Sequence, residues 1–347
     1  FGTATVSVDK LLRRLDIYTL ATASVDAQDE RTMRMLRAYA TGVNVRLDQV
    51  NAQALGRGAP EMFLFNAPMA PWRPADSLAI IKLMGLQLSS HMSEEVLRAR
   101  MSLALDDPAR LADILPDVPG PGVASLPEYA SLVPGTVPSF AAIKDDPHPL
   151  SPFRPRGFAG ASNAWAAAAS RSASGGTLLA NDPHLGFSAP AVWYLARLSL
   201  QSGSVIGGTI PGMPVVLTGR SDNLGWGLTT AYVDDQDVLI EELNPENPAQ
   251  YRTPDGFKDF ETRESILQIN DADPVTLTLR WSDNGPILPG SFRNLETVTP
   301  SGHVAALSWT VLSPSDTSVQ SGLRLMMAQT VAEAITAAEG HIAPAQN

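Results

Sequence analysis

Proline is distributed unevenly along this chain, and its clustering limits where regular structure can form. Ten of the 28 prolines lie between Pro116 and Pro155. Proline has no backbone N–H and a fixed φ, so this segment is unsuited to a helix or a central strand. Long loops are uncommon in compact domains unless they are functional or disordered. We therefore predict an exposed, irregular spacer, which is the kind of segment that a protease enters most easily.

The sequence before the spacer has the spacing of helices. From Asp29 to Val43 apolar residues recur at steps of three and four, and Asp29 is available as an N-cap. A second helix is predicted from Ser93 to Leu105, with Ser93 as its N-cap. This part of the chain is therefore expected to be mainly helical.

The sequence after the spacer is typical of strands and then of a final helix. Val275–Leu279 alternates apolar and polar residues with period two, as a strand with one buried face does. A helix is expected from about Gly322 to Glu339. Further strands are predicted in the short apolar runs Leu195–Leu200, Val205–Ile210 and Val215–Leu217. Helices followed by many strands and then a helix favour a layered α+β fold.

Composition and charge exclude several classes of function. The chain has 347 residues, of which 44% are hydrophobic and 18% charged, so it can bury a large core. Its net charge of −11 disfavours binding to nucleic acid or to an anionic membrane. No apolar run is long enough to span a bilayer, so membrane insertion is not expected. The absence of cysteine excludes disulfides, thiolate catalysis and thiolate metal sites.

Ser162 lies directly behind the spacer, in the run Gly-Ala-Ser-Asn-Ala-Trp at residues 160–165. If the chain is cut before Ser162, this residue supplies both a hydroxyl nucleophile and a free α-amine. The amine has a reference pKa of about 7.7 to 8, so it can accept the hydroxyl proton near neutral pH. Such a residue needs no separate triad. The alternative from these residues alone is a serine that merely opens a strand after a loop.

Five sequence elements occur in an order that resembles the penicillin acylase family of N-terminal nucleophile hydrolases. They are Gly-Ala-Ser-Asn-Ala-Trp at 160–165, Asn-Asp-Pro-His at 181–184, Ile-Pro-Gly-Met-Pro at 210–214, Asn-Leu-Gly-Trp-Gly-Leu-Thr-Thr at 223–230 with the acidic run 234–237, and Ala-Pro-Ala-Gln-Asn at 343–347. In that family the precursor cuts itself before a serine that is followed by asparagine. The resemblance covers most of residues 76–347.

The resemblance implies a fold, a processing scheme and a location. The fold is the four-layer αββα sandwich of these hydrolases, within the α+β class. Residues 1–115 would form a helical part of the small (alpha) subunit, 116–161 the removed spacer peptide, and 162–347 a large (beta) subunit portion that is truncated at its C-terminus. The mature protein is then an alpha/beta heterodimer made from one precursor. Family members are typically periplasmic or secreted, so the same is expected here.

The resemblance also assigns catalytic roles. Ser162 is the nucleophile and its α-amine the base. Asn347 matches a side-chain donor to the oxyanion, and the backbone N–H of Thr230 matches the second donor. Fixed donors of this kind stabilise the charge that develops on the carbonyl oxygen. His184 would orient the nucleophile through a hydrogen bond rather than act as a base.

A structural calcium ion is implied by the same resemblance, and no organic cofactor is expected. The family's ligands match Glu94, Asp234, the carbonyl of Gln236, and Asp237. Calcium prefers six to eight oxygen ligands of mixed type. The residues by themselves favour an acidic turn over an ion site.

The positions that match the family's acyl pocket carry mainly aliphatic residues. They are Gln87, Leu88, Leu185, Thr218 and Leu228. An aliphatic lining suits a linear acyl chain, since burial of each methylene contributes about 0.8 kcal/mol. N-acyl homoserine lactones and aliphatic penicillins are therefore the expected substrates, ahead of aromatic penicillins and glutaryl cephalosporins.

The predicted function is that of an N-terminal serine amidohydrolase, which cleaves an acyl amide through an acyl-enzyme on Ser162. Two other interpretations remain open from the sequence. One is a non-catalytic or unprocessed acyl-binding member of the family. The other is a conventional serine hydrolase with His184 as its base.

Overall fold

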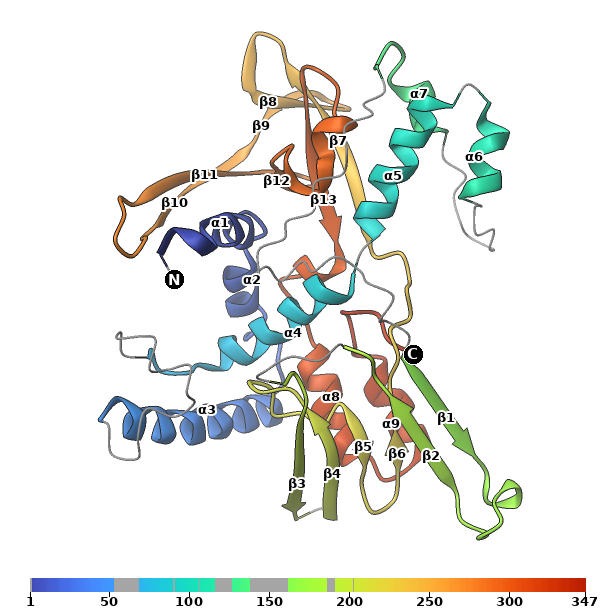
Figure 1. The fold of residues 1–347 in the computed structure, drawn as a ribbon. Coiled ribbons are helices and arrows are strands. Elements are labelled where there is room, and N and C mark those ends of the chain that lie inside the picture. The colour runs from blue at the N-terminus through green and yellow to red at the C-terminus, as the bar shows by residue number, and fades with distance from the viewer. Residues whose placement is uncertain are drawn as a thin grey trace. The chain divides into compact units, whose positions relative to one another are not determined.

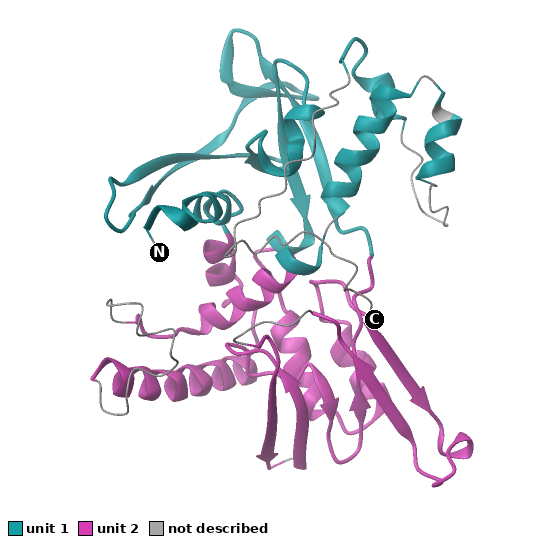
Figure 2. Cartoon of the chain, in the orientation of Figure 1, with its two compact units in different colours: residues 1–16, 86–155, 233–312 teal, residues 17–85, 156–232, 313–347 magenta. Residues whose placement is uncertain are grey.

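The computed structural model folds into two compact units, each assembled from three stretches of the chain (Figures 1 and 2). Unit 1 comprises residues 1–16, 86–155 and 233–312, and unit 2 comprises 17–85, 156–232 and 313–347. Both contain helices and antiparallel sheets, so the α+β class is confirmed. The structure describes residues 2–52, 69–89, 91–105, 107–115, 127–137, 162–185, 191–201 and 203–347.

Unit 1 is built around a seven-stranded antiparallel sheet in the order β10-β11-β12-β13-β7-β8-β9. Its strands are β7 (Gln236–Asn244), β8 (Asn247–Thr253), β9 (Gly256–Asp259), β10 (Glu261–Leu267), β11 (Val275–Ser282), β12 (Gly285–Leu288) and β13 (His303–Trp309). Its helices are α1 (Val6–Arg14), α5 (His91–Ala104), α6 (Pro108–Ile114) and α7 (Tyr129–Leu132), with short 3-10 helices η1 (Gly2–Thr5), η4 (Phe292–Thr297) and η5 (Thr310–Leu312).

The alternation predicted for Val275–Leu279 is confirmed in β11. Leu277 and Leu279 are buried, while Thr276 and Thr278 are exposed. A small core lies farther along the sheet, where the rings of Tyr251 and Phe260 stack with centroids 4.8 Å apart. In β11, one face is thus buried and the other solvated, as the period-two pattern indicates.

Two expectations for the helices of unit 1 are wrong in detail. Ser93 does not cap α5, because the helix begins at His91 and already includes it. A helix also forms inside the predicted spacer, where α7 fits between Pro127 and Pro134. Four residues without proline suffice for one helical turn, and the hydroxyl of Ser102 on α5 accepts a hydrogen bond from the N–H of Ala130. The proline count therefore limits the length of a helix rather than excluding one.

Unit 2 contains a four-stranded sheet in the order β3-β4-β5-β6 and a separate hairpin, β1-β2. Its strands are β1 (Asn163–Ala167), β2 (Leu178–Asp182), β3 (Tyr194–Leu200), β4 (Gly203–Thr209), β5 (Thr218–Arg220) and β6 (Gly225–Trp226). Its helices are α2 (Ile17–Ala23), α3 (Glu30–Asn51), α4 (Pro74–Leu88, whose last residues belong to unit 1), α8 (Ser318–Met327) and α9 (Val331–Ala338), with the 3-10 helix η3 (Ala169–Arg171).

The core of unit 2 lies between helices and the four-stranded sheet. Leu36 from α3, Leu78 from α4 and Leu323 from α8 pack with Val205 of β4 in one buried cluster. Trp226 of β6 joins it, and its indole N–H donates to the carbonyl of Val216. This core therefore includes β6, which ends two residues before Leu228.

The helix predicted from Asp29 is confirmed, and its cap is in place. The side chain of Asp29 accepts a hydrogen bond from the N–H of Thr32, and Met33, Leu36 and Ala40 are buried. The helix continues to Asn51, beyond the predicted end.

Two other predictions for unit 2 are wrong. The helix expected from Gly322 to Glu339 is two helices, because Thr330 caps α9 by accepting a hydrogen bond from the N–H of Glu333. The run Val215–Leu217 is not a strand. Val215 and Val216 are buried in the core. The apolar residues of this run therefore indicate burial and not a strand.

None of the described helices is long and apolar enough to cross a membrane.

Candidate functional site

Ser162 immediately precedes β1, the first strand of unit 2 after the predicted spacer. It is half-buried. Asn163 follows it and pairs with Asp182 of β2 in an antiparallel register. Ser162 therefore lies at the open end of the β1-β2 hairpin, and Figure 1 shows that this end lies beside the C-terminus.

Asn181 of β2 connects this hairpin to a second segment of the chain. Its amide nitrogen donates to the carbonyl of Asn163 at 2.8 Å and to the carbonyl of Leu228 at 3.0 Å. Its amide oxygen accepts the N–H of Leu228 at 3.2 Å. One side chain thus takes the place of a strand partner for Leu228 and fixes it relative to the residue after Ser162.

Gly227 makes this close approach possible. A Cβ atom at this position would lie 2.9 Å from the Cβ of Asn181 and 3.0 Å from its Cγ. Real side chains do not approach so closely, so a larger residue would push Asn181 away from Leu228. Packing therefore requires glycine at position 227.

Asn347 is held on the other side of the same segment. The N–H of Asn347 donates to the carbonyl of Thr229 at 2.8 Å, and the N–H of Thr229 donates back to the carbonyl of Asn347 at 3.1 Å. Ala231 donates to Ala345, and Thr230 and Gln346 form an antiparallel bridge. The side-chain amide of Asn347 lies 3.3 Å from the hydroxyl of Thr229.

The backbone N–H of Thr230 points away from the backbone of the segment 345–347 with which its neighbours pair. In extended chain, successive N–H groups point to opposite sides. Leu228 donates towards Asn181, and Thr229 and Ala231 donate towards the C-terminal segment. By this alternation the N–H of Thr230 points to the side of Asn181, where the hairpin that follows Ser162 lies.

His184 has a carboxylate neighbour that the sequence analysis did not identify. Its Nε2 lies 3.2 Å from Oδ2 of Asp182, and both side chains are substantially exposed. Asp182 is the register partner of Asn163, so the pair lies close to the start of β1. Among the hydrogen bonds of the described residues there is none from Ser162 to His184.

The predicted pocket residues are divided between the units. Gln87 and Leu88 end α4 in unit 1, where Gln87 is exposed and Leu88 half-buried. Leu185, Thr218 and Leu228 belong to unit 2, and all three are half-buried. Leu228 is the member of this set that the hydrogen bonds of Asn181 place next to the hairpin.

The predicted calcium ligands lie at the start of β7 and on α5, both in unit 1. Glu95 borders Asp234 and Asp237, and its burial, followed by these two negative charges, raises the pKa of its carboxyl to about 7. Glu94 is exposed, whereas the side chain of Gln236 is buried and accepts the N–H of Met92. Within the described residues, no group of three or more His, Cys, Asp or Glu side chains could hold a metal ion as arranged. The side chains in this geometry therefore do not form a closed metal site.

Unit 2 thus brings together four of the residues that the sequence singled out. Asn181 bonds to Asn163, the residue after Ser162, and to Leu228, and the two neighbours of Thr230 bond to the segment that ends in Asn347. The side chain of Asn181 connects the hairpin that follows Ser162 to the segment that contains Leu228 and Thr230. The Asn-Asp-Pro-His element at 181–184 includes Asn181. Nothing in the sequence indicates the two hydrogen bonds that Asn181 makes with Leu228.

The whole chain matches a known family profile. The profile described as penicillin amidase matches residues 1–347. One curated relative is the acyl-homoserine lactone acylase QuiP of Pseudomonas aeruginosa, which is 28% identical over 292 residues and matches 83% of this chain and 34% of its own length. Penicillin acylase 2 proenzyme of Pseudomonas sp. (strain SE83) is 27% identical over 303 residues, with 83% of this chain and 37% of the relative covered.

Among solved structures, a thermostable penicillin G acylase from Alcaligenes faecalis is similar with a TM-score of 0.47 and 24% sequence identity. The match covers 53% of this chain and 32% of that one. The chain spans about a third of the length of the curated relatives it matches.

Proposed function

The chain belongs to the penicillin amidase family, and from this premise we propose that it is part of an acylase whose nucleophile is Ser162. Cleavage between Ala161 and Ser162 would free the α-amine of Ser162. The observation that supports this proposal is the hydrogen-bonded connection from Asn163 through Asn181 and Leu228 to Asn347, because it gathers the predicted nucleophile and both oxyanion donors in one unit.

The proposed reaction proceeds by acyl transfer to Ser162. The freed α-amine accepts the hydroxyl proton while Oγ attacks the acyl carbonyl carbon. The oxyanion that forms is stabilised by the N–H of Thr230 and the side-chain amide of Asn347. Collapse of this intermediate breaks the C–N bond, and the departing amine takes the proton from the α-ammonium group. Water then hydrolyses the ester on Ser162 by the same route.

We propose a linear fatty acyl amide as the substrate, with N-acyl homoserine lactones ahead of aliphatic penicillins. Leu185, Thr218 and Leu228 of unit 2 are the proposed acyl pocket, and the two leucines supply its aliphatic lining. Relatives named acyl-homoserine lactone acylase and penicillin acylase support this substrate range. Each methylene buried should raise kcat/KM about fourfold, from about 0.8 kcal/mol, until the chain outgrows the pocket.

The remaining predictions belong to the same proposal. They are the αββα sandwich, a heterodimer made from one precursor, export to the periplasm or beyond, and a structural calcium ion. A relative named as a proenzyme supports processing. For calcium the donors are Glu94, Asp234, Gln236 and Asp237, and Glu95 is a further oxygen donor beside the two aspartates. Chelation should lower the thermal midpoint, and excess calcium, but not magnesium, should restore it.

The proposal is tested by N-terminal sequencing and intact-mass measurement of purified protein, combined with hydrolysis assays. Two fragments, one of which begins at Ser162, are expected in active material. Ser162→Ala should remain uncut and inactive. Activity in uncut protein, or turnover by Ser162→Ala, would contradict the proposal.

A conventional serine hydrolase is the second candidate, and the contact between His184 and Asp182 is the observation that favours it. An aspartate in contact with a histidine supplies two of the three residues of a Ser-His-Asp triad. This candidate predicts activity without cleavage and complete loss of activity in His184→Ala. The N-terminal serine mechanism instead predicts that His184→Ala keeps part of its activity after processing.

A further inference from the structure

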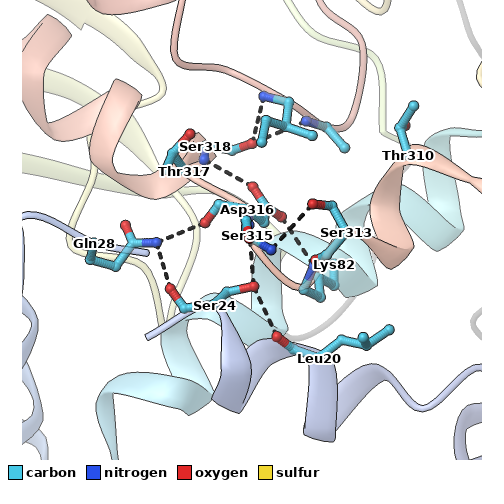
Figure 3. Close-up of polar contacts among 12 residues, drawn as sticks. Leu20, Ser24, Gln28, Lys82, Thr310, Ser313, Ser315, Asp316, Thr317 and Ser318 are labelled. Atoms are coloured by element: carbon cyan, nitrogen blue, oxygen red, sulfur yellow. Dashed lines mark hydrogen bonds and ion pairs between the residues drawn. The ribbon is translucent and has the colours of Figure 1, made fainter. Parts of the chain in front are cut away.

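A buried network lies at the start of α8, in the same unit as the candidate site (Figure 3). Its centre is Asp316, which is 3% exposed. Oδ2 of its carboxylate lies 3.3 Å from Nζ of Lys82, and Oδ1 accepts the N–H of Ser318 at 2.9 Å. Lys82 also donates to the carbonyl of Ser313 at 2.9 Å. Both ends of the carboxylate are therefore engaged.

The backbone of Asp316 is fixed as firmly as its side chain. Its N–H donates to the hydroxyl of Ser24 at 3.3 Å, and its carbonyl accepts the amide of Gln28 at 2.7 Å. Ser24 in turn donates to the carbonyl of Leu20 at the end of α2. Lys82 comes from α4, and Ser24 and Gln28 come from the turn between α2 and α3, so two separate parts of the chain define the position of Asp316 just before α8.

A buried ion pair needs an explanation beyond stability. Removing two charges from water carries a large desolvation penalty, and apolar residues of similar volume often stabilise a fold as well or better. Such pairs are retained in some proteins because they define one conformation. The pair of Lys82 and Asp316 is therefore expected to define one conformation of the chain at the start of α8.

The hydroxyl of Ser318 carries the network to the chain segment that ends in Asn347. It accepts the N–H of Ile342 at 3.0 Å and the N–H of Ala343 at 3.0 Å. From Ala343 the chain runs directly to Ala345 and Asn347, which pair with Ala231 and Thr229. The segment is therefore held at its start by Ser318 and at its end by its partner segment.

We infer that Ser318, oriented by Asp316 and Lys82, is a positioning residue that sets the location of the Asn347 amide in the oxyanion site. This inference rests on the proposed function. Ser318 touches neither substrate nor reacting atoms. Its effect is exerted through the Ile342–Asn347 segment, so its loss should weaken stabilisation of the transition state and leave substrate binding unchanged.

Ser318→Ala is the test variant, and Ser321→Ala is its matched control. Ser321 is also buried on α8, and its hydroxyl donates to the carbonyl of Ala337 in α9, ahead of the segment in question. Both variants lose one buried hydroxyl bonded to the C-terminal part of the chain. A general loss of stability would affect them equally, whereas positioning of Asn347 would affect Ser318→Ala alone.

The kinetic readout is hydrolysis of N-decanoyl homoserine lactone by the processed protein. We expect kcat to fall about tenfold in Ser318→Ala with KM unchanged, and to stay near wild type in Ser321→Ala, since a displaced oxyanion donor acts on the transition state. In an Asn347→Ala background, Ser318→Ala should cause no further loss. A full additional tenfold loss in that background, or an unchanged kcat in the single variant, would overturn the inference.

Hydrogen exchange measures the effect of Ser318 on the C-terminal segment without relying on enzymatic activity. Exchange at the amides of Ala231 and Asn347 should be about tenfold faster in Ser318→Ala than in wild type, because the hydrogen bonds from Ile342 and Ala343 no longer hold the start of the segment. Ser321→Ala should leave it unchanged, and Ser318→Thr, which keeps the hydroxyl, should restore slow exchange. If Asn347→Ala keeps wild-type kcat, the oxyanion assignment fails. Equal exchange in Ser318→Ala and wild type would instead reject the role of Ser318.

Discussion

One buried set of polar contacts in unit 2 can be compared with one exposed ion pair in unit 1. In unit 2, Lys82 and Ser318 are buried and bond to distant backbone, Lys82 to the carbonyl of Ser313 and Ser318 to the start of the segment that ends in Asn347. In unit 1, pairs such as Arg252 with Glu242 lie on the surface of the sheet, with side chains about half exposed. Buried polar contacts define a geometry because breaking them leaves unsatisfied groups, whereas exposed contacts are exchanged for water at little cost.

The largest effect that this comparison predicts is for the buried ion pair of unit 2. Lys82→Ala should lower the free energy of unfolding by about 3 to 5 kcal/mol, because it leaves the Asp316 carboxylate buried without its partner. Urea denaturation followed by circular dichroism measures this change. The double variant Lys82→Met/Asp316→Asn removes both charges and should recover most of the loss. A change below about 1 kcal/mol in Lys82→Ala would mean that the pair is no more important than a surface pair.

A smaller effect is expected for Asn181, which joins Asn163 to Leu228. Asn181→Ala should cost about 1 to 3 kcal/mol, because three backbone groups in a half-buried place lose their partner. The same variant should lower kcat, since it separates the start of β1 from the Thr230 segment. Asn223→Ala removes an exposed asparagine of the same unit and is the control. Equal stability and kcat in the two variants would contradict the assigned role of Asn181.

The N-cap of α3 has an effect that depends on pH. Partial burial of Asp29 raises the pKa of its carboxyl. The hydrogen bonds from Thr32 and Arg324 outweigh this effect and lower the pKa to about 2. Because this value is below the unfolded value of about 3.9, the charged form contributes stability above pH 4, and the contribution is lost as the pH falls through about 2.

The measurement for this cap compares wild type with Asp29→Asn and Asp29→Ala across pH 2 to 7. At neutral pH Asp29→Ala should cost about 1 kcal/mol, a value typical of an N-cap whose ion pair is screened by solvent. Asp29→Asn keeps the cap without the charge, so its difference from wild type should vanish at the acid end. A difference that stays constant with pH would exclude the ionic contribution.

The smallest effect is expected on the surface of unit 1. Arg252→Ala removes the ion pair with Glu242 and the stacking of its guanidinium over the ring of Phe257. Because both charges are exposed, the urea midpoint should not change measurably at physiological salt. A loss as large as that of Lys82→Ala would show that exposure does not separate the two kinds of contact.

The local elements were predictable where a short-range rule decides them. Asp29 before a run with steps of three and four predicted α3, and the alternation in Val275–Leu279 predicted β11. The break between α8 and α9 was also readable, because Thr330 and Glu333 have the spacing of a capping box. It was missed because no glycine or proline separates the two helices.

The site was predictable only as a set of separate positions. Family-like motifs marked Ser162, Thr230 and Asn347, but their connection depends on Asn181, which reaches Leu228 across 47 positions of the sequence. The contact of Lys82 with Asp316 spans 234 positions. Periodicity and capping rules describe neighbours in sequence, so contacts of this range become visible only once the core of unit 2 has brought the strand ends and α8 together.

The central claim is that Ser162 becomes an N-terminal residue and then carries the acyl group. Peptide mass mapping of protein that has been acid-quenched during turnover of an acyl homoserine lactone tests this most directly. We expect an acyl mass on Oγ of a peptide that begins at Ser162, and we expect it to disappear when substrate is exhausted. An acyl mass on a peptide that runs unbroken through Ala161 and Ser162, or on any other residue, would contradict it.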